Sequence, residues 1–385
     1  MTASGAPRLT SRAAPRHAMH RHASHQEVTF VHPYASLSAR SFWRTAVAEP
    51  DPADITGLWT PKFALGQDDP VLTAGSCFAR HLGPALLEEG MYWQDAEPAP
   101  PGLTAAERRE RHYGQFSFRT GNIYTAAALL QWLSWAFGET EPPEEVWSEA
   151  GSHHDPFRPS VEPGGFASPG AVAAARQVTL AAIRDAVSSA SCLIFTLGLT
   201  EAWLDRATGA VHQVCPGTVH GTFDPARHVF HNFTAAEVHR DLSAAVALAR
   251  RANPGLRVLL TVSPVPLTAT ATGGHALPAT TYSKSVLRAA AGQLAVELDH
   301  VDYFPSYEIV TGLPFGRRFF EPNLRTVTPQ GVAFVMRHFF EALGQRAAAT
   351  RPVPTPDSRT AGGEDHWCED AVLDYYNRGQ VPPAR

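Results

Sequence analysis

The stretch V-L-T-A-G-S-C-F-A-R-H, residues 71–81, decides the fold class of this chain. Its first four residues form a short apolar run that predicts a buried strand, and a glycine turn and a helix through Leu87 follow. An apolar run without strict alternation is typical of a strand covered on both faces. In α/β proteins the working side chains lie just beyond the carboxyl ends of such strands.

The same alternation of apolar runs and helical stretches continues along the chain. Further strands are predicted at 190–199, 257–262 and 300–304, and helices at 124–137, 234–251, 283–298 and 329–340. Thr234 and Glu237 form a capping box, and Thr328 is an N-cap before a first-turn proline. This pattern predicts an α/β fold in which a parallel sheet lies between helices.

The ends of the chain differ in composition from its middle. Residues 1–27 are Ala, Arg, Ser and His without a hydrophobic period, which predicts a disordered N-terminal tail. Residues 347–385 are rich in Pro, Arg, Asp and Gly, which predicts a loose C-terminal tail. One α/β domain is expected over 28–346. Clusters of Pro and Trp mark an insertion at about 91–170, which we expect to cap the sheet edge.

Composition excludes several classes of protein. The 385 residues are 44% hydrophobic with a net charge of −5, which provides a large core and argues against a nucleic-acid partner. The longest apolar stretch, 126–138, is too short to cross a bilayer, so no membrane partner is expected. No nucleotide or metal-binding motif occurs, so we expect no cofactor and no metal. The cysteines lie far apart, which favours a reduced cytoplasmic protein: Cys77, Cys192, Cys215 and Cys368.

Lysine is rare in this chain. Of 32 basic residues only Lys62 and Lys284 are lysines, as a coding bias toward arginine would produce. Lys284 lies in Y-S-K-S, residues 282–285, where we expect a helix to begin after a loop. A lysine there would stabilise a thiolate or bind a phosphate or carboxylate of an acyl donor. The alternative is a first-turn lysine that faces solvent.

A series of motifs resembles the GSCFA-domain family. They are residues 71–81, G-N-I-Y-T (121–125), D-P-F-R-P (155–159), T-L-G-L-T-E-A-W (196–203), T-V-S-P-V-P-L (261–267), Y-S-K-S-V-L-R (282–288) and Y-F-P-S-Y-E-I (303–309). That family resembles the SGNH/GDSL hydrolases. The resemblance implies a flavodoxin-like (SGNH-type) three-layer α/β/α sandwich and the chemistry of esterases and acyltransferases.

The resemblance also implies a nucleophile. The Gly-Asp-Ser motif of those hydrolases falls on Gly75, Ser76 and Cys77, so the nucleophile position carries a thiol. A thiolate is the stronger nucleophile, which favours Cys77, and Ser76 is the alternative. A free cysteine is also a common small filler of a core, and that role for Cys77 stays open.

The oxyanion-binding positions match only in part. Gly198 falls on the glycine of the family's G-x-N-D motif and Glu201 on its acidic residue, but the asparagine is missing. Asn122 is the nearest substitute, because a side-chain amide donates to a developing oxyanion. The alternatives are an ordinary helix N-cap at Asn122 and a first-turn carboxylate at Glu201.

The general base departs from the family pattern. The motif D-x-x-H-P falls on R-T-V-T-P, so Arg325 replaces the aspartate and Thr328 the histidine. We expect His275 to act as the base, because it lies on the loop after a strand. The other candidates are His81, His220, His228 and His231. The departure argues against simple serine-esterase chemistry.

These observations lead to two hypotheses of different classes. The first is an enzyme that transfers or hydrolyses an acyl group through Cys77 or Ser76, on an acylated sugar or another small metabolite. The second is a binding module that keeps the fold without the chemistry, as the missing D-x-x-H pattern suggests.

Overall fold

The computed structural model describes residues 32–344. The tails predicted at 1–27 and 347–385 lie outside these residues. The chain divides into two compact units at Pro50. In the described part of the first unit the chain forms three short helical turns at Pro33–Ser36, Ala39–Ser41 and Arg44–Ala48.

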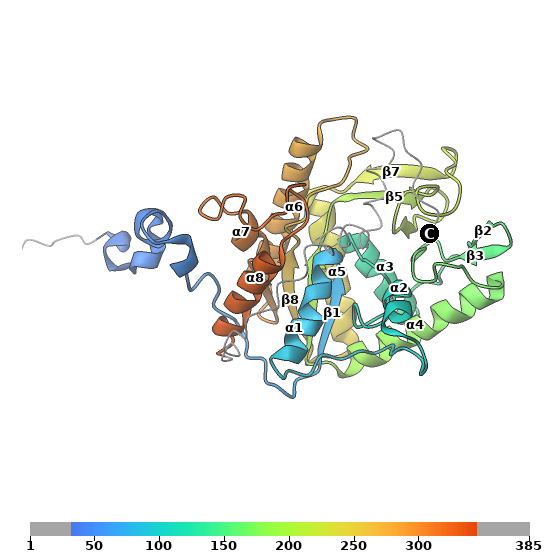
Figure 1. The fold of residues 1–385 in the computed structure, drawn as a ribbon, viewed down its shortest axis with the longest axis horizontal. Helices are drawn as coiled ribbons and strands as arrows, with labels where there is room; N and C mark the ends of the chain where they lie inside the picture. Colours follow the sequence, from blue (N-terminus) through green and yellow to red (C-terminus); the bar gives the residue numbers. More distant parts are fainter. Residues whose placement is uncertain (1–31, 345–385) are drawn as a thin grey trace, which may run out of the picture. The chain divides into compact units, whose positions relative to one another are not determined.

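The second unit is built on a parallel sheet (Figure 1). Within its described residues, 51–344, four strands pair in parallel in the order β1 (Val71–Gly75), β4 (Cys192–Leu197), β8 (Arg257–Val262) and β9 (Val301–Phe304). The strand predicted at 257–262 is confirmed with the same bounds, and the other predicted strands lie within a few residues of theirs. The parallel α/β fold expected from the apolar runs is confirmed.

A single parallel bridge extends the sheet beyond β1. Trp93 pairs with Val71, whose N–H donates to the Tyr92 carbonyl at 2.9 Å and whose carbonyl accepts from the Gln94 N–H at 2.9 Å. The segment that follows β1 therefore lies on one side of it, and β4 lies on the other. This is the flavodoxin-like order, with its second strand reduced to one bridge. The switch point of the sheet lies between β1 and β4.

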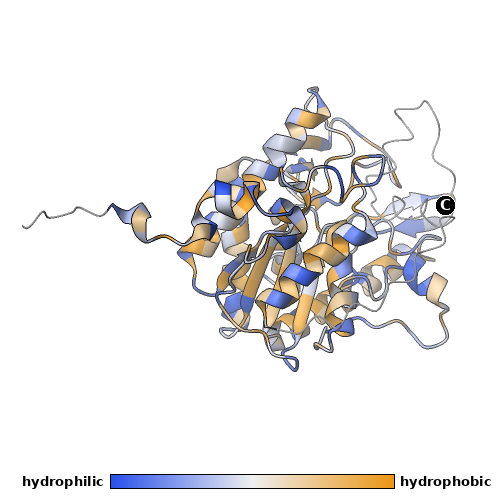
Figure 2. Cartoon of the chain, turned by 60° about the vertical axis from the view of Figure 1, so that its left-hand side comes forward, coloured by the Kyte–Doolittle hydropathy of each residue, from blue (hydrophilic) through white to orange (hydrophobic). Residues whose placement is uncertain are grey.

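Helices cover both faces of the sheet, as Figure 2 shows by the apolar strands between them. On one face are α1 (Leu82–Glu88), α7 (Ser306–Thr311) and α8 (Pro329–Ala342), which pack against Val71, Ile194 and Phe304. On the other are α3 (Ala126–Ala136), α4 (Pro169–Ser189), α5 (Ala235–Ala252) and α6 (Ala276–Glu297), which pack against Leu72, Phe195 and Leu260. Neighbouring strand residues thus face opposite layers. None of the helices in 32–344 is long and apolar enough to cross a membrane.

Two small antiparallel sheets are inserted into this frame. One pairs β2 (Trp147–Glu149) with β3 (Ser152–His154). The other has the order β6 (Val211–His212), β5 (Glu201–Asp205) and β7 (His228–Asn232). The segment 91–170 also holds α2 (Ala105–Glu110) and α3, and α3 lies in the helical layer of the core rather than in a cap.

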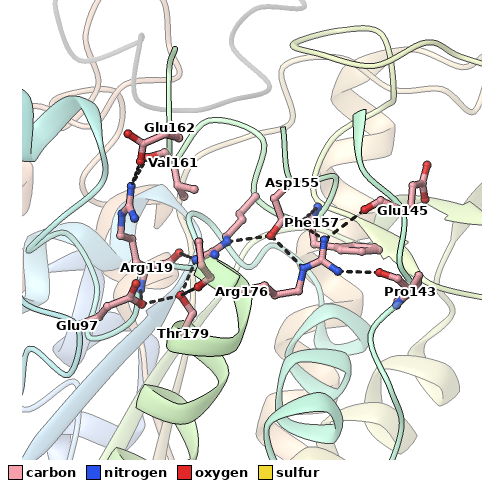
Figure 3. Close-up of polar contacts among 12 residues, drawn as sticks. Glu97, Arg119, Pro143, Glu145, Asp155, Phe157, Val161, Glu162, Arg176 and Thr179 are labelled. Carbon is pink, nitrogen blue, oxygen red and sulfur yellow. Dashed lines mark hydrogen bonds and ion pairs between the residues drawn. The ribbon is translucent and has the colours of Figure 1, made fainter. Parts of the chain in front are cut away.

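A buried ionic cluster ties the segment 91–170 to α4 (Figure 3). The Asp155 carboxylate is fully buried and accepts from Arg158 Nε at 3.0 Å. It also accepts from Arg176 Nη2 at 2.8 Å and Nε at 3.1 Å, which makes a bidentate pair. The D-P-F-R-P motif therefore supplies both signs of a buried charge pair, which accounts for it structurally.

The cluster continues through shared hydrogen bonds. Arg158 Nη1 donates to Thr179 Oγ1 at 2.5 Å, and Thr179 in turn donates to Glu97 Oε2 at 2.7 Å. Arg119 Nη2 pairs with Glu162 Oε2 at 2.5 Å. Burial raises the pKa of the Asp155 carboxyl, but the charges of Arg158 and Arg176 outweigh it and hold that pKa below its usual value.

We predict that Arg176→Met destabilises the protein by about 3–5 kcal/mol, because it leaves the buried Asp155 carboxylate with Arg158 as its single charged partner. Arg184→Met, on the exposed side of the same helix, is the matched control. The depressed pKa of Asp155 contributes stability at pH values above the pKa of the same carboxyl in the unfolded chain. That contribution should disappear as the pH falls, and the stability lost in this way should be smaller in Arg176→Met than in the natural chain. Denaturant unfolding at several pH values measures both effects, and equal losses in the two variants would contradict the prediction.

Candidate functional site

The switch point is closed by a close approach of three chain segments. Ile123 N–H donates to the Gly75 carbonyl at 2.8 Å, and the Tyr124 carbonyl accepts from Gly198 N–H at 2.9 Å and Leu199 N–H at 3.1 Å. Gly75 has φ +132°, and a Cβ there would collide with the backbone of Thr196. Only glycine fits this position. The segment 122–124 therefore joins the carboxyl ends of β1 and β4.

Ser76 and Cys77 lie at the end of β1. Ser76 N–H donates to the Thr196 carbonyl at 2.9 Å, and Cys77 begins a short 3-10 helix, Cys77–His81, that leads into α1. Ser76 is 1% exposed and Cys77 8%. The Ser76 hydroxyl has no hydrogen-bond partner among the described residues. A buried hydroxyl in that state costs about 1–3 kcal/mol, which a bound acceptor would recover.

Both residues line a small recess. Its free volume is about 10 Å³, about the room that one water molecule needs. Its walls are Ser76, Cys77, Tyr124, Gly198, Leu199, Ser263, Val265, Pro266, Leu267 and Arg325. Four of the predicted motifs thus meet at one place: the ends of β1, β4 and β8 and the segment 121–125.

Arg325 brings a positive charge to this recess. It is 8% exposed and comes from the loop before α8. It occupies the position at which the D-x-x-H-P motif of the SGNH/GDSL hydrolases has its aspartate. Its neighbour in that motif, Thr328, is the N-cap of α8, and its hydroxyl accepts from Gly331 N–H at 3.1 Å. The sequence therefore marks Arg325 by a positive charge at a motif position that is otherwise negative.

Gly198 is held by its backbone on both sides. Its N–H donates to Tyr124, and its carbonyl accepts from Lys284 Nζ at 2.5 Å. The Gly198 N–H is thus engaged rather than directed at an oxyanion in this structure. Lys284 is 1% exposed and lies in the middle of α6, which begins at Ala276, so the expected first-turn position was wrong. Lys284 fixes the end of β4.

Asn122 and Glu201 lie beside the recess but not in its walls. Asn122 is 3% exposed, and its carbonyl accepts from Gln213 Nε2 at 2.8 Å. Thr125, not Asn122, is the N-cap of α3. Glu201 lies in β5 rather than in a helix, and its carboxylate accepts from Thr270 Oγ1 at 2.6 Å and Ala271 N–H at 3.1 Å.

The candidate bases lie elsewhere. His275 is exposed and is the N-cap of α6, where its Nδ1 accepts from Leu277 N–H at 3.1 Å. Burial, with a smaller contribution from Arg80, lowers the pKa of His81 to about 4, and its ring packs against Phe78.

The remaining candidate histidines also have partners outside the recess. His220 contacts Glu149, His228 contacts Asp224, and His231 contacts Glu237. Of the described residues that line the recess, none is a histidine. The described walls of the recess therefore supply no imidazole.

One cluster has the residue types of a metal site. Ligand atoms of Glu145, His212 and His228 lie within 4.8 Å of one another. However, His228 Nδ1 accepts from Asp224 N–H at 3.0 Å, which leaves the proton of the neutral ring on Nε2, and Arg227 pairs with Glu145 at 3.2 Å. The proton on His228 Nε2 and the Arg227 guanidinium thus lie where a metal ion would need lone pairs. The Nδ1 lone pair of His228 and the charge of Glu145 are therefore already engaged by protein groups.

We predict that Lys284→Arg destabilises the protein by about 1–3 kcal/mol, because the larger guanidinium overfills a closed site and moves the Gly198 carbonyl. Lys62→Arg is the matched control, since Lys62 also bonds backbone carbonyls but is exposed. Thermal unfolding of both variants measures the difference. Equal unfolding temperatures of the two variants would show that Lys284 does not support the end of β4.

Comparison with known proteins adds one finding on top of this geometry. Among curated proteins, none matches the chain. The sequence profile of the GSCFA family matches residues 70–339, which include every strand of the parallel sheet and every wall of the recess. The chain belongs to the GSCFA family.

Proposed function

We propose that the protein is an acyl-transfer enzyme or esterase that uses Cys77 as its nucleophile. The observation that carries the proposal is the pair formed by the Cys77 thiol and the buried Ser76 hydroxyl, which has no partner among the described residues. Both line a recess at the switch point of the sheet, where α/β proteins bind ligands. An acylated sugar or another small metabolite is the proposed substrate, with no cofactor.

The first step is attack of the Cys77 thiolate on a thioester. A bond forms from the sulfur to the carbonyl carbon, and the collapse of the tetrahedral intermediate breaks the donor's carbon–sulfur bond and expels its thiolate, which takes up the proton that Cys77 has lost. In the second step an alcohol or water attacks the acyl-cysteine, and its proton passes to the leaving Cys77 sulfur. A thiolate that replaces a thiolate needs no histidine for the first step, which suits a recess without one.

Ser76 and Arg325 are the proposed stabilisers of negative charge. The Ser76 hydroxyl is in a position to donate to the oxyanion, and the Arg325 guanidinium lines the same recess. They replace the Gly198 N–H, which is bonded to Tyr124. Preformed donors of this kind act strongly in a buried site because they do not reorganise during the reaction.

The second candidate is a binding module without covalent chemistry. The observation in its favour is the lack of a histidine among the described walls of the recess. In that case Arg325 and Ser76 would hold a carboxylate or another anion, and Cys77 would be a small filler beside Val265.

Mass spectrometry of the intact protein with an acyl thioester separates the two candidates. We predict one acyl adduct on the natural chain, none on Cys77→Ala, and an adduct that forms about 10²–10³ times more slowly on Ser76→Ala, where an oxyanion donor is missing. Cys192→Ala is the control, because burial raises the pKa of that thiol to about 12 and keeps it unreactive.

An adduct that persists in Cys77→Ala would disprove the nucleophile. No adduct on any variant, together with a ligand that still raises the melting temperature, would favour the binding module.

A second prediction concerns Arg325. We expect Arg325→Gln to slow acylation of Cys77 by about 10²-fold, because the charge that stabilises the thiolate and the oxyanion is removed. Arg318→Gln, an exposed arginine of the preceding loop, is the matched control. Stopped-time mass spectrometry gives the two rates. If both variants react alike, Arg325 has no part in the chemistry.

A further inference from the structure

A second hollow adjoins the nucleophile recess. Its volume is about 220 Å³, and Tyr124, Leu199 and Leu267 line both hollows. The recess itself has room for about one water-sized group, which is the size of a carbonyl oxygen. The remainder of any acyl group bound at Cys77 therefore has to lie elsewhere, and the adjoining hollow is beside it.

The walls of this hollow are mostly apolar. They come from Tyr124 before α3, from Leu199 just after β4, from the small sheet of β5, β6 and β7 (Figure 1) with the loop after β6, and from the loop that precedes α6. The apolar lining residues are Tyr124, Leu199, Ala202, Trp203, Val214, Phe230, Leu267, Ala269 and Ala271. An apolar hollow with a polar group at one end is the usual form of a small-molecule site.

Few of the polar groups in these walls are charged. Both carboxylate oxygens of Glu201 accept hydrogen bonds from the loop residues Thr270 and Ala271. Burial lowers the pKa of His212 to about 4, so its ring is neutral at ordinary pH. Burial also raises the pKa of the Cys215 thiol to about 11, which keeps it protonated. Glu201 is thus the one charged side chain among the described walls, and hydrogen bonds from the loop hold both of its oxygens.

We propose that this hollow, the acyl pocket, binds an unbranched aliphatic chain whose carbonyl carbon lies at Cys77. The inference rests on the proposed function and names its substrate class: a medium-chain acyl thioester. A volume of about 220 Å³ has room for a chain of several carbons. Longer chains extend past the pocket, and shorter ones leave apolar wall uncovered.

The test measures binding apart from chemistry. Isothermal titration of Cys77→Ala with straight-chain acyl thioesters of N-acetylcysteamine gives affinity without turnover. We expect affinity to rise about fourfold for each added methylene and to level off once the chain fills the pocket. Affinity that does not depend on chain length would overturn the acyl pocket.

Two changes in the walls should move the plateau in opposite directions. Cys215→Phe fills the pocket from a half-buried position, so the plateau should come at a shorter chain. Trp203→Ala enlarges the pocket, so it should come at a longer one. Val296→Phe is the matched control for added size, because Val296 is 86% exposed on α6. A plateau that stays in place in both variants, while both remain folded by circular dichroism, would place the chain elsewhere.

The outcomes also separate this inference from the proposed function. Length-dependent binding with no adduct on the natural chain keeps the acyl pocket and removes the chemistry. An adduct on Cys77 with no length dependence keeps the chemistry and removes the acyl pocket.

Discussion

The approach of three backbones at the end of β1 is the constraint on which the site depends. One carbonyl, that of Tyr124, holds the amides of Gly198 and Leu199, and Ile123 holds the carbonyl of Gly75. A side chain at Gly75 would collide with β4, and one at Gly198 would lie 3.0 Å from Ser76 Cβ. The glycines are therefore needed for contact between segments more than for chemistry. This contact places the thiol and the hydroxyl in one recess.

Charged side chains also hold the segments around the recess in place. The Asp155 cluster fixes the segment 91–170 against α4, and this segment includes the residues that join β1 to β4. Lys284 adds a bond from α6 to the end of β4. Buried charges of this kind are costly to separate and contribute little net stability as pairs. Their effect here is to define one arrangement of the segments around the recess.

The sequence predicted the frame better than the site. The apolar run of β8 and the capping box of α5 are local signals, and both match the structure. The sequence predicts the start of α6 at residue 283, seven residues after its start at Ala276, and Pro278 lies in the first turn, where a proline fits. The sheet of β5 to β7 is not predicted, and its β5–β7 ladder joins residues 23 to 31 apart in the sequence. His275 lies at the α6 cap, and the partners of Gly198 come from two distant segments. Such contacts leave no periodic pattern.

Arg325 lies where the D-x-x-H-P motif has an aspartate, so the sign of the charge at this position is reversed. A motif that ends in an acid and a base polarises a hydroxyl, which needs a proton acceptor before it attacks. A thiol ionises far more readily and needs only an environment that favours its anion. In the proposed mechanism Arg325, which lines the same recess as Cys77, provides that environment and accepts no proton. The cysteine at position 77 and the arginine at position 325 then act together, because the positive charge of the arginine favours the anion of the thiol.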